Sequence, residues 1–270
     1  MSADPLPSMS RIDTTIPHPA RRYDYLLGGT TNFPADRESG DRMIAAFPAA
    51  RTTVVENRRF MRRAVAELAR SGIRQFLDVG SGIPTSPNTH EVAQGIAPES
   101  RVVYVDNDPI VLMHAKELLT GSEEGATAYL EADLHRPGDI LEHPDLRRTL
   151  DLSQPVALML VAVLHFFPDA QRPYDLVGSL VRALAPGSCL VMSHATADFV
   201  PPHTAARLDQ IVRDEPFQVR TRVQFAAFFD GLELIDPGIR GVSEWRSENE
   251  PPPRPPAEAI GCYGAVARIP

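Results

Sequence analysis

The sequence predicts an α/β fold built on a parallel sheet, and three observations support this prediction. Apolar runs end near Asp78, Asp106, Asp133, Val163 and His194. The intervals between these ends are 28, 27, 30 and 31 residues, about the length of one strand plus one crossover helix. The first run leads into a glycine-rich turn. In open sheets of this kind, ligands bind in the crevice beyond the carboxyl ends of the strands.

Hydrophobic periodicity and helix signals place the elements of this alternating region. The expected strands cover residues 75–79, 101–106, 127–132, 156–163 and 188–194, and the expected helices cover 87–96, 109–120, 138–150 and 172–185. Ser86 is a candidate N-cap because Pro87 follows it at the first helical position. Later elements are expected as helices near 203–213 and 222–230, a strand near 231–236 and an edge-region strand over 262–268.

The first 72 residues are expected to form an N-terminal arm with a helical extension, followed by the sheet domain in residues 73–270. Residues 1–20 contain several prolines, which oppose regular structure. Helical spacing of apolar residues predicts helices over 35–47 and 53–71. Residues 21–33 fit neither a helix face nor a strand.

Composition argues against two classes of partner. The net charge is −8, Lys116 is the only lysine, and the arginines are scattered rather than clustered, so nucleic acid is not expected. The longest apolar run, residues 156–167, is too short to span a bilayer, and the N-terminus has no apolar signal segment. We therefore expect a cytoplasmic protein. Cys189 and Cys262 are interpreted as core residues, and no spacing suggests a metal site.

The turn after the first strand constrains the charge of the ligand. Gly80 and Gly82 allow the backbone to approach a ligand closely. A dinucleotide fingerprint requires glycine where Thr85 stands, and no lysine of a phosphate-binding loop is nearby. Asp78 would repel a pyrophosphate at short range, whereas it would attract an ammonium or sulfonium group. The turn therefore favours a cationic ligand.

Two further strand ends carry acids suited to a nucleoside. Asp106 follows the second strand, 24 residues after Gly82, where an acid typically accepts hydrogen bonds from ribose hydroxyls. Its neighbour Asn107 is a candidate contact to the base. At the third strand end, Asp133 can accept the exocyclic amine of adenine while Leu134 packs on the ring.

Specific motifs in the chain resemble those of known families. The series Asp78-Val-Gly80-Ser-Gly82, Val103-Tyr104-Val105-Asp106, Ala132-Asp133 and Leu184-Ala-Pro186-Gly187 resembles that of class I S-adenosylmethionine-dependent methyltransferases. The segments His18-Pro-Ala-Arg21, Tyr23-Asp-Tyr25-Leu-Leu-Gly28-Gly29, Asn32-Phe33 and Asn88-Thr-His90-Glu-Val-Ala93-Gln94 resemble the bacterial S-adenosyl methyltransferase family formerly catalogued as a domain of unknown function. The second resemblance extends over most of the chain.

The resemblance implies a Rossmann-like sheet of about seven strands with the last antiparallel between its neighbours, flanked by helices and preceded by a helical extension. It implies S-adenosyl-L-methionine as the cofactor. Asp78 would bind the methionine amino group, and Gly80, Ser81 and Gly82 would face the methionine and ribose. Asp106 with Asn107, and Asp133 with Leu134, would keep the nucleoside roles given above. The chain departs from the full glycine motif at Pro84.

Methyl transfer is an in-line displacement that depends mainly on alignment, so a general base is optional. His165, just past the fourth strand, is the candidate base or acceptor contact, and His194 is a weaker one. The Asn-Pro-Pro-aromatic segment of some amine methylators is absent there, which argues against a nucleobase or glutamine nitrogen as acceptor. We expect a small-molecule acceptor.

The segment 21–33 is the candidate lid, in which Tyr23, Tyr25 and Asn32 close over the cofactor or line the acceptor pocket. The alternative is an arm packed on the domain surface. Trp245 and Arg246 either border the acceptor side or anchor their own loop.

Two other functions compete with a small-molecule methyltransferase. An NAD(P)-dependent oxidoreductase is disfavoured by Thr85, by Asp78 and by the lack of a tyrosine four residues before Lys116. A non-catalytic S-adenosylmethionine-binding sensor stays open, because methyl transfer requires no diagnostic catalytic residue.

Overall fold

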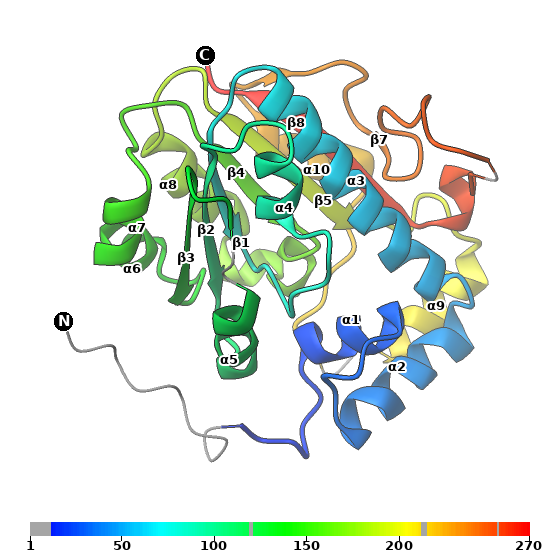
Figure 1. Ribbon diagram of the computed structural model, residues 1–270. Helices are drawn as coiled ribbons and strands as arrows, with labels where there is room; N and C mark the ends of the chain where they lie inside the picture. Colours follow the sequence, from blue (N-terminus) through cyan, green and yellow to red (C-terminus); the bar gives the residue numbers. More distant parts are fainter. Residues whose placement is uncertain (1–11, 119–120, 212–214, 253) are drawn as a thin grey trace.

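The computed structural model describes residues 12–118, 121–211, 215–252 and 254–270 (Figure 1). The strands are β1 (Gln75–Val79), β2 (Arg101–Asp106), β3 (Ala126–Glu131), β4 (Ala157–Val161), β5 (Cys189–Ala195), β6 (Glu233–Leu234), β7 (Arg240–Gly241) and β8 (Cys262–Arg268). They form one sheet in the order β3-β2-β1-β4-β5-β8-β6, and β7 also pairs with β8. Strands β1 to β5 are parallel and β8 is antiparallel to its neighbours. The predicted Rossmann-like sheet is confirmed.

Helices surround this sheet and extend it at the N-terminus. They are α1 (Pro19–Leu27), α2 (Pro34–Ala46), α3 (Ala50–Arg70), α4 (Thr89–Gln94), α5 (Pro109–Leu118), α6 (Pro137–Glu142), α7 (Pro144–Thr149), α8 (Pro173–Arg182), α9 (Pro202–Ile211) and α10 (Arg222–Ala226). Short 3-10 turns cover Leu164–Phe166, Asp169–Gln171, Ala227–Phe229 and Ala257–Ala259.

The two faces of the sheet bury separate apolar clusters because successive side chains of a strand point to opposite faces. Phe76 of β1 packs with Phe60 and Met61 of α3 on one face. The next residue, Leu77, packs with Ile140 of α6 and Leu180 of α8 on the other. Both faces are therefore covered, which explains why β1 is buried throughout.

Strand β1 lies between β2 and β4, so the strand order reverses at its carboxyl end. Such a switch point is where open α/β sheets bind ligands. Figure 1 shows α1 and α2 at this edge of the sheet. Buried Arg21 of α1 fixes them there, with its guanidinium 3.4 Å from Asp108 after β2 and 3.7 Å from Asp36 of α2. Arg22 pairs with Glu215 at 2.6 Å.

Two expectations about the N-terminal half are wrong. Residues 21–33 include most of α1, which begins at Pro19 and ends against Gly28 in a left-handed C-cap conformation. Helix α4 begins at Thr89 rather than after Ser86, because Glu91 accepts a hydrogen bond from the backbone N–H of Asn88 at 2.6 Å and forms its capping interaction.

Two expectations about later segments are also wrong. The single helix over 138–150 is divided at Pro144, whose missing N–H interrupts the helical ladder. The closing strand β8 is interior rather than edge-region, since it pairs with β5 on one side and with β6 and β7 on the other. The expected helix ends at 119–120 and 212–213 lie outside the described residues, as do residues 1–11 of the expected irregular N-terminus. Among the described helices, none is both long and apolar enough to span a bilayer.

Candidate functional site

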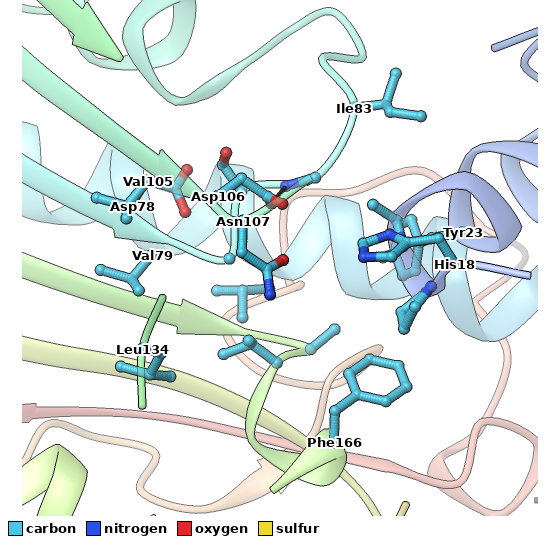
Figure 2. A pocket seen from close by; sticks show the side chains of 18 of the residues that line it. His18, Tyr23, Asp78, Val79, Ile83, Val105, Asp106, Asn107, Leu134 and Phe166 are labelled. Carbon is cyan, nitrogen blue, oxygen red and sulfur yellow. Dashed lines mark hydrogen bonds between the residues drawn. The ribbon is translucent and has the colours of Figure 1, made fainter. Parts of the chain in front are cut away.

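A cavity of about 270 Å³ lies at the carboxyl ends of β1 to β4, beneath α1 and α3 (Figure 2). Its walls come from four strand ends, two helices and one later segment. The lining residues are His18, Pro19, Ala20, Tyr23, Leu27, Asn57, Arg58, Met61, Asp78, Val79, Gly80, Ser81, Gly82, Ile83, Thr85, Val105, Asp106, Asn107, Ala132, Asp133, Leu134, His135, Val161, Ala162, Val163, Phe166, Phe167 and Pro216.

The structure brings the eight residues expected to bind the cofactor together around this one cavity. They are Asp78, Gly80, Ser81, Gly82, Asp106, Asn107, Asp133 and Leu134. Of the three expected lid residues, Tyr23 lines the cavity, whereas Tyr25 and Asn32 do not. His165 is not part of the lining either.

The glycine turn makes close approach to the cavity possible. Gly80 has φ of 73°, and a Cβ at this position would lie 2.6 Å from Cγ2 of Val163. Gly82 has φ of 67°, and no atom lies within 4 Å of the position that a Cβ would take there, so its space is open. Both conformations favour glycine, and the turn leaves room for a ligand.

Asp78 is a buried carboxylate whose environment opposes its charge. It is 7% exposed and accepts a hydrogen bond from Thr89 Oγ1 at 2.6 Å. Burial raises the pKa of Asp78, although this hydrogen bond and the charge of Arg58 act in the opposite direction. Within the described residues it forms no ion pair. A cation entering the cavity would therefore gain a strong partner.

Asp106 stabilises the local backbone and also keeps lone pairs with which it can bind a ligand. Its Oδ2 accepts the N–H of Gly82 at 2.8 Å and its Oδ1 accepts the N–H of Asp108 at 3.0 Å. Burial raises the pKa of Asp106, and these two backbone hydrogen bonds oppose the shift. The carboxylate thus holds the glycine turn against the end of β2, and its remaining lone pairs can accept hydroxyl donors.

Asp133 is more exposed than Asp78 and Asp106, and its pKa is shifted in the opposite direction. Burial raises its pKa, but the hydrogen bonds from His135, at 2.9 Å from the backbone N–H and 2.7 Å from Nδ1, outweigh burial and leave the pKa lowered. Asp133 therefore stays ionised as an acceptor, beside the buried side chain of Leu134.

Helix α3 contributes one wall of the cavity, called the α3 wall below, and the sequence did not predict its residues. Asn57, Arg58 and Met61 all line the cavity. Arg58 donates from Nη2 to Thr85 O at 2.6 Å, while its buried Nε has no partner among the described residues. No local sequence signal identifies these residues, because their place depends on how α3 packs on the sheet.

The turn after β4 forms the apolar side of the cavity. Ala162 adopts a left-handed backbone with φ of 57°, which is costly for a residue with a Cβ. Its N–H donates to Ser193 Oγ at 2.9 Å. Val163, Phe166 and Pro216 complete this side.

The remaining expected lid residues face elsewhere. Tyr25 donates its hydroxyl hydrogen to Asp41 at 2.6 Å, and its ring fills the space beside Gly40. Asn32 donates to Asp24 at 2.8 Å and to Gly29 O at 2.9 Å. Both residues therefore stabilise the packing of the N-terminal extension rather than line the cavity.

The two histidines after β4 and in β5 form a buried pair, with ring centroids 5.7 Å apart, and neither lines the cavity. His194 is fully buried; its Nδ1 donates to Ala195 O at 2.8 Å and its Nε2 accepts from Arg220 at 2.7 Å. Burial lowers the pKa of His194 to about 4. His165 is 9% exposed and packs against Phe166 and Phe217, and burial holds its pKa well below 6.5.

Trp245 and Arg246 lie away from the cavity. Trp245 is fully buried and meets Phe60 edge-on at 5.5 Å, and the Arg246 guanidinium stacks over the indole at 5.5 Å. Trp245 thus anchors its loop. Across the described ranges, no cluster of three histidine, cysteine or acidic side chains has a metal-binding arrangement.

This chain matches one family model over nearly its whole length and is similar to solved structures of high sequence identity. The model of the family described as S-adenosyl methyltransferase matches residues 6–270. A DUF574 family protein from Streptomyces avermitilis is 48% identical, with a TM-score of 0.89, over 96% of this chain and 99% of its own. A Thermobifida fusca protein provisionally described as a methyltransferase is 40% identical, with a TM-score of 0.86, over 95% and 96% of the two chains.

More distant structures share the fold alone. The N-methyltransferase NodS from Bradyrhizobium japonicum, in complex with S-adenosyl-L-homocysteine, is 15% identical with a TM-score of 0.50, over 93% of this chain and 99% of its own. A search of the curated proteins gives no significant match.

Proposed function

The chain belongs to the S-adenosyl methyltransferase family, and on that premise we propose how its cavity holds S-adenosyl-L-methionine and what kind of acceptor it methylates. The observation that carries the proposal is the grouping of Asp78, Asp106 and Asp133 around one cavity beside an open glycine turn. Such a site favours a cationic nucleoside over a pyrophosphate.

The nucleoside half of the site lies at the ends of β2 and β3. Asp106 accepts the ribose hydroxyls through the lone pairs that the Gly82 and Asp108 N–H groups leave free. Asp133 accepts the adenine amine, and the buried Leu134 packs on the base. Asn107, whose side chain points toward the centre of the cavity in Figure 2, contacts the same nucleoside.

The amino-acid half requires one anion and one cation from the protein. Asp78 supplies the anion for the ammonium group. Arg58 supplies the cation for the carboxylate through its buried, unpartnered Nε. This pairing accounts for two features that are unfavourable without a ligand, namely a charged buried acid and an unsatisfied buried donor.

The cofactor supplies a methyl group activated by its sulfonium. The protein contributes alignment: the glycine turn, the α3 wall and the Ala162 turn restrict an acceptor to one approach, which suits an in-line displacement. A small molecule is the acceptor, since the cavity beneath α1 and α3 has a volume of only about 270 Å³, part of which the cofactor would occupy. No step in this scheme requires His165, which does not line the cavity and packs against Phe166 and Phe217.

Calorimetric titration with S-adenosyl-L-homocysteine tests these assignments. Asp106→Ala is expected to weaken binding by about 1–3 kcal/mol, since the ribose hydroxyls lose their acceptor. Arg58→Gln is expected to weaken it through the carboxylate. Asp139→Ala, on the exposed start of α6, is the matched control with unchanged affinity. Unchanged affinity in Asp106→Ala, or binding of NAD in preference to S-adenosyl-L-homocysteine, would contradict the proposal.

A further inference from the structure

The α3 wall contains a buried hydrogen-bond acceptor that no described residue satisfies. Asn57 is 2% exposed and lines the cavity, yet its Oδ1 has no partner among the described residues. Its neighbour fixes the amide orientation. Tyr23 donates its single hydroxyl hydrogen to Val54 O at 3.1 Å, so Asn57 donates from Nδ2 to the Tyr23 oxygen at 2.9 Å. Oδ1 is left without a donor, and a ligand that supplies one would remove this penalty.

Asn57 lies at the end of the α3 wall away from Asp78, the proposed partner of the cofactor ammonium. Met61, one helical turn later, contacts the Thr89 hydroxyl at 3.6 Å, and this hydroxyl is bound to Asp78. The α3 wall therefore extends from Met61, which lies near Asp78, to Asn57, which contacts Tyr23. A donor for Asn57 Oδ1 fits a second ligand beside the cofactor better than it fits the cofactor ammonium.

The surroundings of Asn57 are apolar and aromatic. Tyr23 and Leu27 of α1 line the cavity on one side, and Phe166 and Pro216 line it on the other. In Figure 2, Tyr23 and Phe166 occupy the side of the cavity away from Asp78 and Asp106. The ionisable lining residues other than tyrosine are His18, Arg58, Asp78, Asp106, Asp133 and His135. The proposed cofactor assignments use four of them, His18 pairs with Asp108 at 3.0 Å, and His135 is hydrogen-bonded to Asp133 at 2.7 Å. An uncharged ring suits the space that is left.

The groups around Asn57 favour a nucleophile that needs no base. An amide oxygen does not take a proton at neutral pH. The Tyr23 hydroxyl is engaged at both ends, and burial raises the pKa of Tyr23 to about 12. A phenol must lose its proton to become an efficient nucleophile, whereas an aryl amine is already neutral at pH 7 and carries a free lone pair together with N–H donors.

We propose, building on the function proposed above, that the methyl acceptor is an uncharged aryl amine whose N–H donates to Asn57 Oδ1. The amine nitrogen attacks the methyl carbon, an N–C bond forms, and the S–C bond breaks with its electron pair remaining on sulfur. The resulting secondary ammonium releases one proton to water. Positive charge develops on nitrogen during attack, so the hydrogen bond to Oδ1 strengthens in the transition state.

Binding to the protein saturated with S-adenosyl-L-homocysteine tests the hydrogen bond without turnover. The probes are aniline and 1-aminonaphthalene, each against its N,N-dimethyl derivative, which has no N–H. The wild-type protein is expected to bind the parent amines about tenfold more tightly than the dimethyl compounds, the value of one hydrogen bond to a buried acceptor. Asn57→Leu should abolish this preference while S-adenosyl-L-homocysteine affinity stays within threefold.

Turnover with methyl-labelled S-adenosyl-L-methionine supplies the second readout. Monomethylation of at least one parent amine is expected, with kcat/KM at least tenfold lower in Asn57→Leu and less affected in Tyr23→Phe, which preserves Oδ1. Phenol and 1-naphthol are assayed in the same way, as the alternative class of acceptor. Val55→Ala, on the exposed face of α3, controls for changes in the helix, and thermal unfolding confirms that each variant folds.

Three outcomes would overturn this inference. They are the absence of amine binding and methylation, faster methylation of the phenols, and a loss of S-adenosyl-L-homocysteine affinity in Asn57→Leu, which would place the amide at the cofactor. Failure of the wild-type protein to bind S-adenosyl-L-homocysteine would instead contradict the proposed cofactor site.

Discussion

At the scale of single residues, the cavity holds two buried carboxylates, Asp78 and Asp106, that have no ion-pair partner in the part of the chain described by the structure. Burial raises the pKa of both. An acid with a raised pKa in the folded state favours folding below its unfolded pKa, and this contribution is lost as the pH rises through the folded pKa. A negative charge on Asp78 is therefore unfavourable in the ligand-free protein, and a bound cation would offset that cost.

Asp78→Asn is expected to raise the Tm of the ligand-free protein at pH 7.5, by about 2–4 °C for each kcal/mol regained. Asparagine keeps a partner for the Thr89 hydroxyl and removes the buried charge. The same variant should bind S-adenosyl-L-methionine more weakly. Scanning calorimetry checks the first effect and titration checks the second, with exposed Asp139→Asn as the control. A lower Tm at pH 7.5 would show that other groups of the protein stabilise the charged carboxylate.

Ala162 offers a test of backbone strain at the cavity. A left-handed conformation costs a residue with a Cβ about 1–2 kcal/mol. Glycine avoids this cost, but on folding it loses conformational entropy worth about 0.5–1 kcal/mol more than alanine loses. Ala162→Gly should therefore be neutral or stabilising by up to about 1.5 kcal/mol in urea unfolding. Ala162→Val should be clearly destabilising. Ala64→Gly, inside α3, should lose stability, and the same sign at both alanines would argue against strain at position 162.

The three acids could be predicted from the sequence because each lies at the end of a strand in a regular βα series. Such a series brings the carboxyl ends of its strands to the same edge of the sheet. Asn57 and Arg58 could not, because they look like ordinary polar residues of a helix until α3 is packed on the sheet. The packing of His165 between two phenylalanine contacts likewise depends on Phe217, which is distant in the sequence.

At the scale of elements, the five parallel strands could be predicted to within about two residues at either end, since apolar runs bounded by turns determine them. Helix α1 was missed although it has Pro19 at its first position and Gly28 after its last turn, two recognised boundary signals. The interior position of β8 was missed for a physical reason. Its alternating residues are typical of an edge region, but α3 packs closely on Gly264 through Phe60, and Ala265 and Ala267 are buried on the other face of the sheet.

Gly264 in β8 tests this close packing. A Cβ there would lie 2.8 Å from Phe60 Cε2, and Phe60 also contacts Trp245 edge-on, which limits the movement of its ring. Gly264→Ala is expected to destabilise the protein by about 1–3 kcal/mol in urea unfolding. Combined with Phe60→Leu, the substitution should cost less than it does alone. Purely additive effects of the two changes would mean that the ring is free to move aside.

At the scale of the whole molecule, the buried histidines make stability sensitive to acid. Burial lowers the pKa of His194 to about 4, below its unfolded value near 6.5, so the unfolded chain binds more protons between these values. Stability therefore rises with pH across this window and falls on acidification.

His194→Gln should reduce the slope of unfolding free energy against pH between about 6.5 and 4 by up to about 1.4 kcal/mol per pH unit, one proton's worth. Glutamine retains an acceptor for Arg220, so the variant keeps part of the network. Urea unfolding across this pH range measures the slope. The exposed His203→Gln should leave it unchanged, and an unaltered slope in His194→Gln would mean that this residue is already charged in the folded protein.

The most direct test of the central claim is a crystal structure of the S-adenosyl-L-homocysteine complex. We expect the ribose hydroxyls at Asp106, the base beside Asn107 and Leu134, and the amino-acid group between Asp78 and Arg58. A nucleoside bound in the opposite direction, or at another surface of the molecule, would contradict this claim.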